Sequence, residues 1–155
     1  SEDYIPELNK DDKIITKKEL ENQLKNSSKG FLDALIIRTK PNSNKKKSRD
    51  YMKESSPFFS IQAMEYIYSL GVQHLLVDMP SVDRLFDEGC LSAHNIFWDT
   101  KNNLLNDETK NKTITEMIFV HDDMIDGPYL LNLQIAPFVS DTSPSRPILF
   151  EINEL

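Results

Sequence analysis

The sequence predicts an α/β fold in which helices pack on a mixed β-sheet. Apolar runs at residues 31–39 and 72–77 have the length and composition of buried strands, and a helical pattern lies between them. Further along the chain, three segments are rich in β-branched and aromatic residues, as strands are: 114–120, 129–138 and 147–152. A chain of 155 residues with 39% hydrophobic content suffices for one core, so we expect a single domain over residues 1–155.

A capping box predicts the first helix. The side chain of Thr16 is expected to accept from the backbone of Glu19, whose carboxylate reaches back to the backbone of Thr16. The helix should run to about Lys25. Because Leu20 and Leu24 give it only a narrow apolar stripe, we expect it to lie on the surface as a lid or edge helix.

The first strand should cover residues 31–39, with both faces buried. Residues 40–56 are polar, basic and punctuated by Pro and Ser, which predicts a long surface loop of low order. This loop contains the run Lys45-Lys46-Lys47-Ser48-Arg49. Since no aromatic residue is interleaved with these cations, we interpret the run as a solvated loop, with a binding patch as the less favoured alternative.

The clearest helical pattern begins at Ser60. Apolar residues recur at helical spacing over residues 61–70, and Gly71 stands where a left-handed C-terminal cap belongs. The strand at residues 72–77 follows and ends at Asp78. Strand, helix and strand in this order predict a parallel pair joined by a right-handed crossover.

Ser92 can cap a short helix that carries His94. The polar, Asn-rich residues 99–112 then predict an inserted loop, which either shapes a pocket or lies in solvent. The three later strand segments complete the expected mixed sheet.

Charge and cysteine content exclude several classes of partner. The formal net charge of -7 argues against nucleic-acid binding, which needs a surplus of Lys and Arg on one face. Cys90 is the only cysteine, so no intramolecular disulfide can form and a reducing, cytoplasmic location fits best. No apolar run is long enough to span a bilayer, and we expect no membrane partner.

The chain has three histidines, of which His94 is the most informative. His74 is expected to pack within its strand with a hydrogen-bond partner, and His121 to lie in a solvated loop. Downstream of His94, Glu116 stands inside an apolar segment, where a carboxylate is costly to bury unless it is paired or bound to a cation. The alternative is that Glu116 points to solvent from an edge strand.

An imidazole and a carboxylate together suit Zn²⁺, Mn²⁺ or Fe²⁺. A catalytic zinc site normally uses three protein ligands, so two ligands hold such an ion weakly. His94 and Glu116 would therefore need further ligands.

Several motifs occur in a fixed order along the chain. They are Asp33-Ala34-Leu35-Ile36-Ile37-Arg38-Thr39, the helical segment 59–71, Val77-Asp78-Met79-Pro80-Ser81-Val82-Asp83, Ser92-Ala93-His94, Thr115-Glu116 and Ser143-Pro144-Ser145-Arg146-Pro147. From about Ile15 to the C-terminus, this series resembles the C-terminal part of the cyclase and kynurenine formamidase family. The specificity of the resemblance comes from the order of the motifs.

The resemblance implies a swivelling β/β/α domain that binds a divalent metal, foremost zinc, with manganese or iron as alternatives. It implies hydrolysis of a small-molecule amide or cyclic amide such as N-formylkynurenine, by a homo-oligomer. His94 and Glu116 match the positions of family metal ligands. The turn with Asp78, Ser81 and Asp83 is expected to shape the site.

The main departure from the family pattern is a missing motif. The family's His-x-Gly-Thr-His-x-Asp stretch, which supplies most metal ligands and the catalytic base, has no counterpart in this sequence. We expect the catalytic residues upstream of Ser1, a domain without its N-terminal part, and impaired hydrolysis by this chain. The alternative is a non-catalytic binding or assembly module that retains the family fold.

Overall fold

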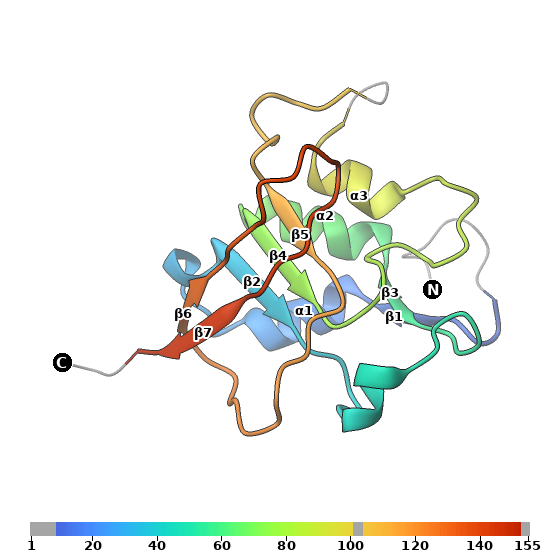
Figure 1. Cartoon of the computed structure of the whole chain (residues 1–155), viewed down its shortest axis with the longest axis horizontal. Helices are drawn as coiled ribbons and strands as arrows, with labels where there is room; N and C mark the ends of the chain where they lie inside the picture. The colour runs from blue at the N-terminus through green and yellow to red at the C-terminus, as the bar shows by residue number, and fades with distance from the viewer. Residues whose placement is uncertain (1–8, 101–103, 153–155) are drawn as a thin grey trace. The chain divides into compact units, whose positions relative to one another are not determined.

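The computed structural model describes residues 9–100 and 104–152 (Figure 1). The chain divides into two compact units, Ser1–Phe119 and Val120–Leu155. Helices and β-sheets together confirm the α/β class. The swivelling β/β/α arrangement and the single domain over residues 1–155 stay predictions. In the part of the chain that is described, no helix is long and apolar enough to cross a membrane.

The first unit contains two parallel sheets. One has three strands in the order β2-β4-β5, with bounds Ala34–Ile37, His74–Val77 and Thr113–Thr115. The other pairs β1 with β3, at Lys13–Ile15 and Pro57–Phe59. The parallel pairing of β2 with β4 confirms the pair expected from the sequence.

Three α-helices of the first unit share one apolar core with β2 and β4. Their bounds are Lys17–Leu24 for α1, Ile61–Ser69 for α2 and Ser92–Phe97 for α3. The core includes Leu20, Leu35, Met64, Ile67, Leu75, Val77 and Phe97. The predicted lid or edge helix α1 thus contributes one fully covered residue, Leu20, and exposes most of its surface.

The predicted caps of α1 and α2 are confirmed. Glu19 donates its backbone N–H to the hydroxyl of Thr16 at 3.3 Å, and its carboxylate accepts from the Thr16 backbone at 3.1 Å. Ser60 accepts from the backbone of Ala63 at 3.1 Å, so it begins α2 as expected. Gly71, with φ of 81°, ends this segment in the left-handed region that glycine tolerates.

Several elements differ from the sequence expectation. β1 and β3 were not predicted as strands, and each forms three residues of strand by pairing with the other. Short 3-10 helices occupy Lys29–Phe31 (η1) and Asn44–Ser48 (η2), the second inside the expected loop. β5 ends at Thr115 rather than near residue 120, because the chain turns at Met117, where φ is 59°.

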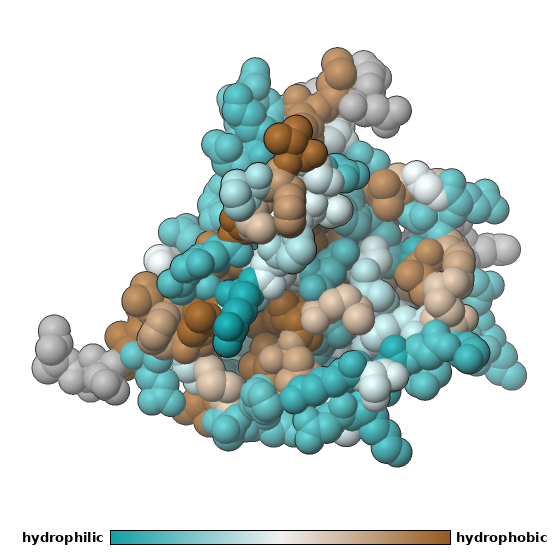
Figure 2. Space-filling model, in the orientation of Figure 1, coloured by the Kyte–Doolittle hydropathy of each residue, from teal (hydrophilic) through white to brown (hydrophobic). Residues whose placement is uncertain are grey.

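The second unit pairs β6 (Tyr129–Asn132) with β7 (Ile148–Glu151) in an antiparallel sheet. Across the described residues, the strands therefore form three separate sheets instead of the single mixed sheet expected. No residue of 120–152 is buried, and one face of this sheet carries exposed Leu130, Ile148 and Phe150. Figure 2 shows apolar residues in patches among the polar residues of the visible surface.

Candidate metal site

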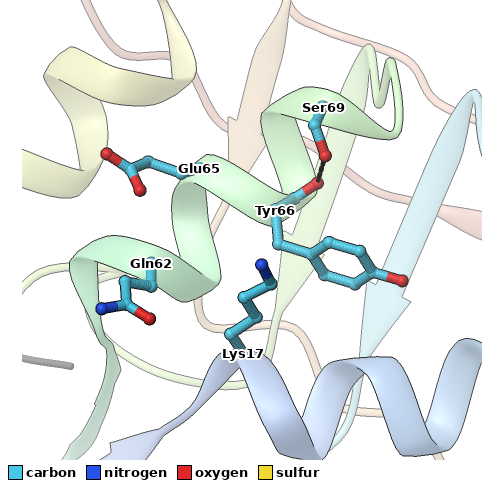
Figure 3. A pocket seen from close by; sticks show the side chains of 5 residues that line it. All are labelled: Lys17, Gln62, Glu65, Tyr66 and Ser69. Carbon is cyan, nitrogen blue, oxygen red and sulfur yellow. Dashed lines mark hydrogen bonds between the residues drawn. The ribbon is translucent and has the colours of Figure 1, made fainter. Parts of the chain in front are cut away.

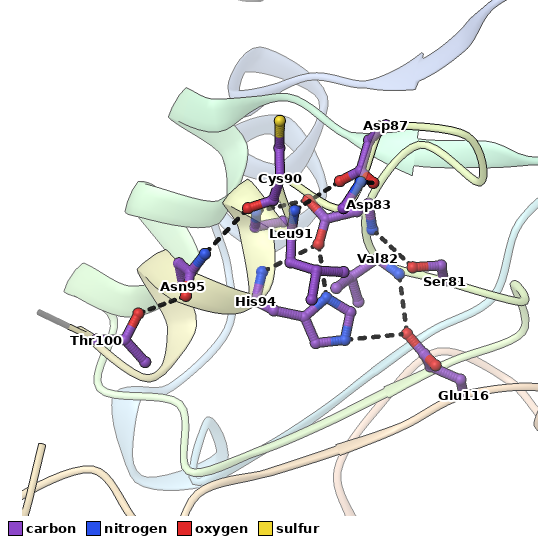
Figure 4. A network of polar contacts seen from close by, with 12 residues as sticks. Ser81, Val82, Asp83, Asp87, Cys90, Leu91, His94, Asn95, Thr100 and Glu116 are labelled. Carbon is purple, nitrogen blue, oxygen red and sulfur yellow. Dashed lines mark hydrogen bonds and ion pairs between the residues drawn. The ribbon is translucent and has the colours of Figure 1, made fainter. Parts of the chain in front are cut away.

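The candidate site is organised around the carboxylate of Asp83, in the turn that follows β4. One oxygen of Asp83 accepts from the backbone N–H of Ala93 at 2.6 Å, and the other accepts from that of His94 at 3.2 Å (Figure 4). These N–H groups belong to the first turn of α3, which lacks intrahelical acceptors. Asp83 therefore caps α3 from a position outside the helix.

The expectation that Ser92 caps α3 is wrong. Leu91 occupies the N-cap position, with φ of 46° and no side-chain hydrogen bond to the helix. Ser92 is the first helical residue, and Asp83 satisfies the N–H groups that follow it. Helix caps are predicted from the residues next to the helix, whereas the cap of α3 comes from Asp83, ten residues before Ala93.

Asp83 also holds the imidazole ring of His94. Its carboxylate lies 2.6 Å from Nδ1 of His94, in position to accept a proton carried on that nitrogen. The ring stacks on Trp98 one turn later, with ring centroids 5.6 Å apart. Trp98 is held in turn by donating Nε1–H to the carbonyl of Lys112 at 3.0 Å. The other ring nitrogen of His94, Nε2, is thereby directed away from Asp83.

Glu116 faces this second nitrogen. Its Oε1 lies 3.6 Å from Nε2 of His94 and accepts from the backbone of Val82 at 3.0 Å (Figure 4). The structure therefore brings together the two residues predicted to be metal ligands. Glu116 does not point freely into solvent, which was the alternative interpretation of its sequence context.

The backbone around Glu116 explains why its side chain does not continue the pattern of β5. β5 ends one residue earlier, yet the N–H groups of Met117 and Ile118 still reach the carbonyls of Met79 and Val77, at 2.9 and 3.2 Å. Hydrogen bonding to the end of β4 therefore resumes after an irregular step at Glu116. Such irregularities in a β-ladder redirect side chains next to functional sites.

The pKa values of both residues are raised. Burial alone lowers the pKa of His94, but the hydrogen bond and charge of Asp83 and the charge of Glu116 outweigh it. Burial raises the pKa of Glu116, although the hydrogen bond from Val82 and the charge of His94 partly oppose this. Both shifts mean that the site retains protons more readily than isolated side chains do.

The stability of the metal-free chain should fall as the pH rises above about 6.5, the ordinary pKa of histidine. Because the folded-state pKa of His94 is raised, its contribution is full below that value and is lost as the pH passes through the raised pKa. Glu116 acts in the same direction above the ordinary glutamate pKa. Urea unfolding at pH 5.5 to 8.5 measures this slope. His94→Gln should flatten it, and an unchanged slope in that variant would contradict the assignment.

The donor pair fits two positions of a metal site. Given bonds of about 2.0–2.2 Å, two ligand atoms of one tetrahedral zinc lie roughly 3.3–3.6 Å apart. The separation of 3.6 Å between Nε2 of His94 and Oε1 of Glu116 agrees with this range. Asp83 supplies the outer carboxylate that commonly fixes a metal-binding histidine. Within residues 9–100 and 104–152, however, no group of three or more His, Cys, Asp or Glu side chains could hold an ion.

The residues of the turn predicted to shape the site belong to two separate hydrogen-bond networks. The hydroxyl of Ser81 accepts from the backbone N–H of Asp83 at 3.1 Å, so Ser81 supports the His94 network. Asp78, at the end of β4, instead accepts from Lys46 at 2.7 Å and from the backbone and hydroxyl of Thr39, both at 2.9 Å. Asp78 therefore connects β4 to the chain after β2.

Sequence reasoning missed Lys46. The run containing Lys46 was interpreted as solvated, but its side chain is 5% exposed and pairs with Asp78, whose side chain is 0% exposed. Asn42 and Thr39 supply further oxygens around the same ammonium group. Its neighbours Lys45 and Lys47 are exposed, so the surrounding sequence gives no signal that distinguishes Lys46.

The other two histidines lie as predicted from the sequence. Nδ1 of His74 lies 2.9 Å from the hydroxyl of Thr113 on the neighbouring strand, which gives this half-buried ring its partner. His121 is exposed in a turn of the second unit. The ring of His74 is therefore held by Thr113 and not by the residues around His94.

A separate hollow of about 340 Å³ lies between α1 and α2 (Figure 3). Its lining includes the ammonium of Lys17, which lies 5.9 Å from the ring centre of Tyr66, and Ser69, which donates to the Tyr66 carbonyl at 2.7 Å. No residue predicted to belong to the metal site lines this hollow.

Comparison with known proteins identifies the family. The chain matches the family model "Putative cyclase" over residues 3–84, more than half of its 155 residues. This stretch includes Asp78, Ser81 and Asp83 and ends before His94 and Glu116. No curated protein matches the chain. The extent of the family match shows that the chain belongs to the cyclase family.

Proposed function

We propose that the chain is part of a metal-dependent hydrolase that cleaves the amide bond of a small molecule. The proposed activity is arylformamidase-like, and its substrate is N-formylkynurenine or a related amide or cyclic amide. His94 and Glu116 are two of the ligands of a divalent ion, foremost Zn²⁺, with Mn²⁺ or Fe²⁺ as alternatives. Membership of the cyclase family supports this class of activity.

One geometric observation carries the proposal. When Nδ1–H of His94 donates to Asp83, Nε2 presents a lone pair toward Oε1 of Glu116, 3.6 Å away. Two acceptors that face each other at this distance repel unless a positive charge lies between them. In the metal-free chain a proton retained by the pair supplies that charge, and a divalent cation can take its place by displacing the proton.

The residues of this chain have distinct roles in the proposal. Asp83 fixes the orientation of the imidazole, and the backbone of Val82 fixes the carboxylate of Glu116. A bound divalent ion would polarise the carbonyl group of the amide and so assist its hydrolysis. Because the described residues bring together only two ligands, we expect weak metal binding and slow turnover by this chain.

Hydrolysis of an N-formylated aromatic amine tests the proposal, with the protein assayed at rising Zn²⁺ concentration. We expect slow hydrolysis above that of free Zn²⁺, and its loss in His94→Ala. Activity that is indifferent to zinc or to this substitution would contradict the proposed site. Turnover within the usual enzyme range of about 1–10³ s⁻¹ would contradict the expectation of impairment.

The alternative is a non-catalytic module that binds a partner or assembles with other copies. The exposed apolar face of Leu130, Ile148 and Phe150 favours this alternative, because an isolated two-stranded sheet is only marginally stable in water. A homo-oligomer that covers this face is compatible with either function. Association of the chain that does not depend on metal, measured by light scattering, together with no zinc-dependent hydrolysis would favour the module.

A further inference from the structure

Trp98 lies between the two segments that carry the proposed metal ligands. It directly follows α3, which carries His94, and its indole N–H donates to the carbonyl of Lys112 at 3.0 Å. Lys112 directly precedes β5, and β5 leads to Glu116. One indole therefore connects the segment of one proposed ligand to the segment of the other.

The indole of Trp98 restrains the imidazole of His94. The two rings are stacked, with centroids 5.6 Å apart and planes inclined by 26°, and this separation is typical of favourable aromatic pairs. Rotation of an imidazole about its last side-chain bond is broad when nothing restrains it. The carboxylate of Asp83 holds one edge of the ring, with its oxygen 2.6 Å from Nδ1, and Trp98 covers one face. Together they direct Nε2 toward Glu116, 3.6 Å away.

Trp98 is itself held by the end of the inserted loop, residues 109–112. The carbonyl of Lys112 accepts from its indole, and the hydroxyl of Thr109 donates to its backbone carbonyl. Thr109 and Lys112 are buried, with exposed fractions of 5% and 7%. The end of the loop therefore packs against Trp98 instead of lying in solvent.

The carbonyl of Lys112 is a well-fixed acceptor. The backbone N–H of Lys112 donates to the carbonyl of Thr109 at 2.9 Å. Its ammonium lies 4.5 Å from the ring centre of Tyr68 and 4.8 Å from that of Phe97. Phe97 also meets Trp98 edge to face, with centroids 5.8 Å apart. A displacement of the loop end would therefore displace Trp98, and the imidazole would lose its restraint.

We propose that Trp98 is a positioning residue of the metal site and that residues 109–112 support it. The indole keeps the imidazole of His94 in the orientation that faces Glu116, and the loop end keeps the indole in place. The ligand concerned is a divalent cation, so the part of this inference that concerns metal rests on the proposed function, whereas the restraint on the ring does not. A site binds its ligand less tightly when its binding-competent conformation is less populated.

The zinc affinity of three variants tests the proposal, measured on the full chain by competition with a chromophoric chelator. Trp98→Leu removes the stacked ring and should weaken zinc binding about two- to tenfold, which corresponds to the contribution of one aromatic pair. Trp98→Phe keeps a ring against His94, so it should recover most of this loss. Thr109→Val removes the hydroxyl that holds the Trp98 carbonyl, and we expect a smaller weakening.

The matched control is Tyr66→Leu. Like Trp98, Tyr66 is a half-buried aromatic residue packed against the core, but its ring lies by the ammonium of Lys17 in α1. This substitution should lower the free energy of unfolding without changing zinc affinity. Urea unfolding of each variant separates a loss of stability from a loss of affinity. If Trp98→Leu does not fold, Thr109→Val decides the same comparison.

A second measurement follows the ring without metal. Three-bond NMR couplings of His94 should show one side-chain rotamer in the unmodified chain and in Trp98→Phe, and averaging in Trp98→Leu. Equal couplings in all three chains would overturn the positioning role, as would equal zinc affinities of Trp98→Leu and Tyr66→Leu. A chain that binds no zinc would contradict the proposed function, and the couplings would still decide the role of Trp98. The two failures are therefore distinguishable.

Discussion

Replacing Asp78 with alanine is expected to lower the free energy of unfolding by about 3–5 kcal/mol. The reason is that Lys46 would keep a buried ammonium group without its carboxylate partner, since the two side chains are 5% and 0% exposed. The hydroxyl and backbone N–H of Thr39 would also lose their acceptor. Urea unfolding at pH 7 measures the change.

A double variant separates the ion pair from simple loss of packing. Lys46→Met with Asp78→Leu replaces both charges by apolar groups of similar size, and such replacements are often close to neutral. We therefore expect the double variant to be more stable than Asp78→Ala. Lys45→Met, at an exposed position of the same run, should change stability by no more than about 0.5 kcal/mol. A loss below about 1 kcal/mol in Asp78→Ala would contradict the structural role of the pair.

Removing either proposed ligand should weaken zinc binding at least about tenfold. Loss of a residue that only hydrogen-bonds to a metal ligand already lowers metal affinity about 10–100-fold. His94→Ala removes the nitrogen and Glu116→Ala the oxygen of a pair 3.6 Å apart. Competition with a chromophoric chelator measures the affinity. The same assay applied to Asp83→Asn tests whether the carboxylate that holds the ring contributes, and a smaller loss is expected.

The matched control is His121→Ala, which removes an exposed histidine of the second unit. Its zinc affinity should equal that of the unmodified chain. If His121→Ala and His94→Ala lost affinity equally, zinc would be binding to surface histidines in general. That result would contradict a site built from His94 and Glu116.

Local signals in the sequence were sufficient for the helices α1 and α2. The hydrogen bonds of the α1 capping box and of the Ser60 cap join residues three apart, so the sequence contains both partners of each bond. The parallel pairing of β2 and β4 was also predictable, because two apolar runs flank a helix of suitable length.

Features formed by distant residues were not predictable. The cap of α3 comes from Asp83, ten residues before Ala93, while Ser92 offered a plausible local cap. The burial of Lys46 depends on Asp78, 32 positions further along the chain. β1 and β3 exist through their mutual pairing, and each is only three residues long, too short for a periodic pattern to identify it.

The candidate site was partly predictable. A glutamate in an apolar segment indicated that Glu116 needs a partner, and His94 is the side chain that the structure brings to it. The sequence could not indicate that the β-ladder is interrupted at Glu116, which allows its carboxylate to turn toward Val82 and His94. The role of Asp83 in holding the imidazole likewise depends on the folded turn.

The most direct test of the account is nitrogen-15 NMR of the three histidine rings during a zinc titration of the full chain. The proposed site predicts that zinc selectively changes the Nε2 signal of His94. Nδ1 of the same ring should stay protonated and hydrogen-bonded to the carboxylate of Asp83. His74 and His121 should be unchanged, and Glu116→Gln should weaken the response of His94. A response confined to His74 or His121, or none at His94 at saturating zinc, would contradict the central claim.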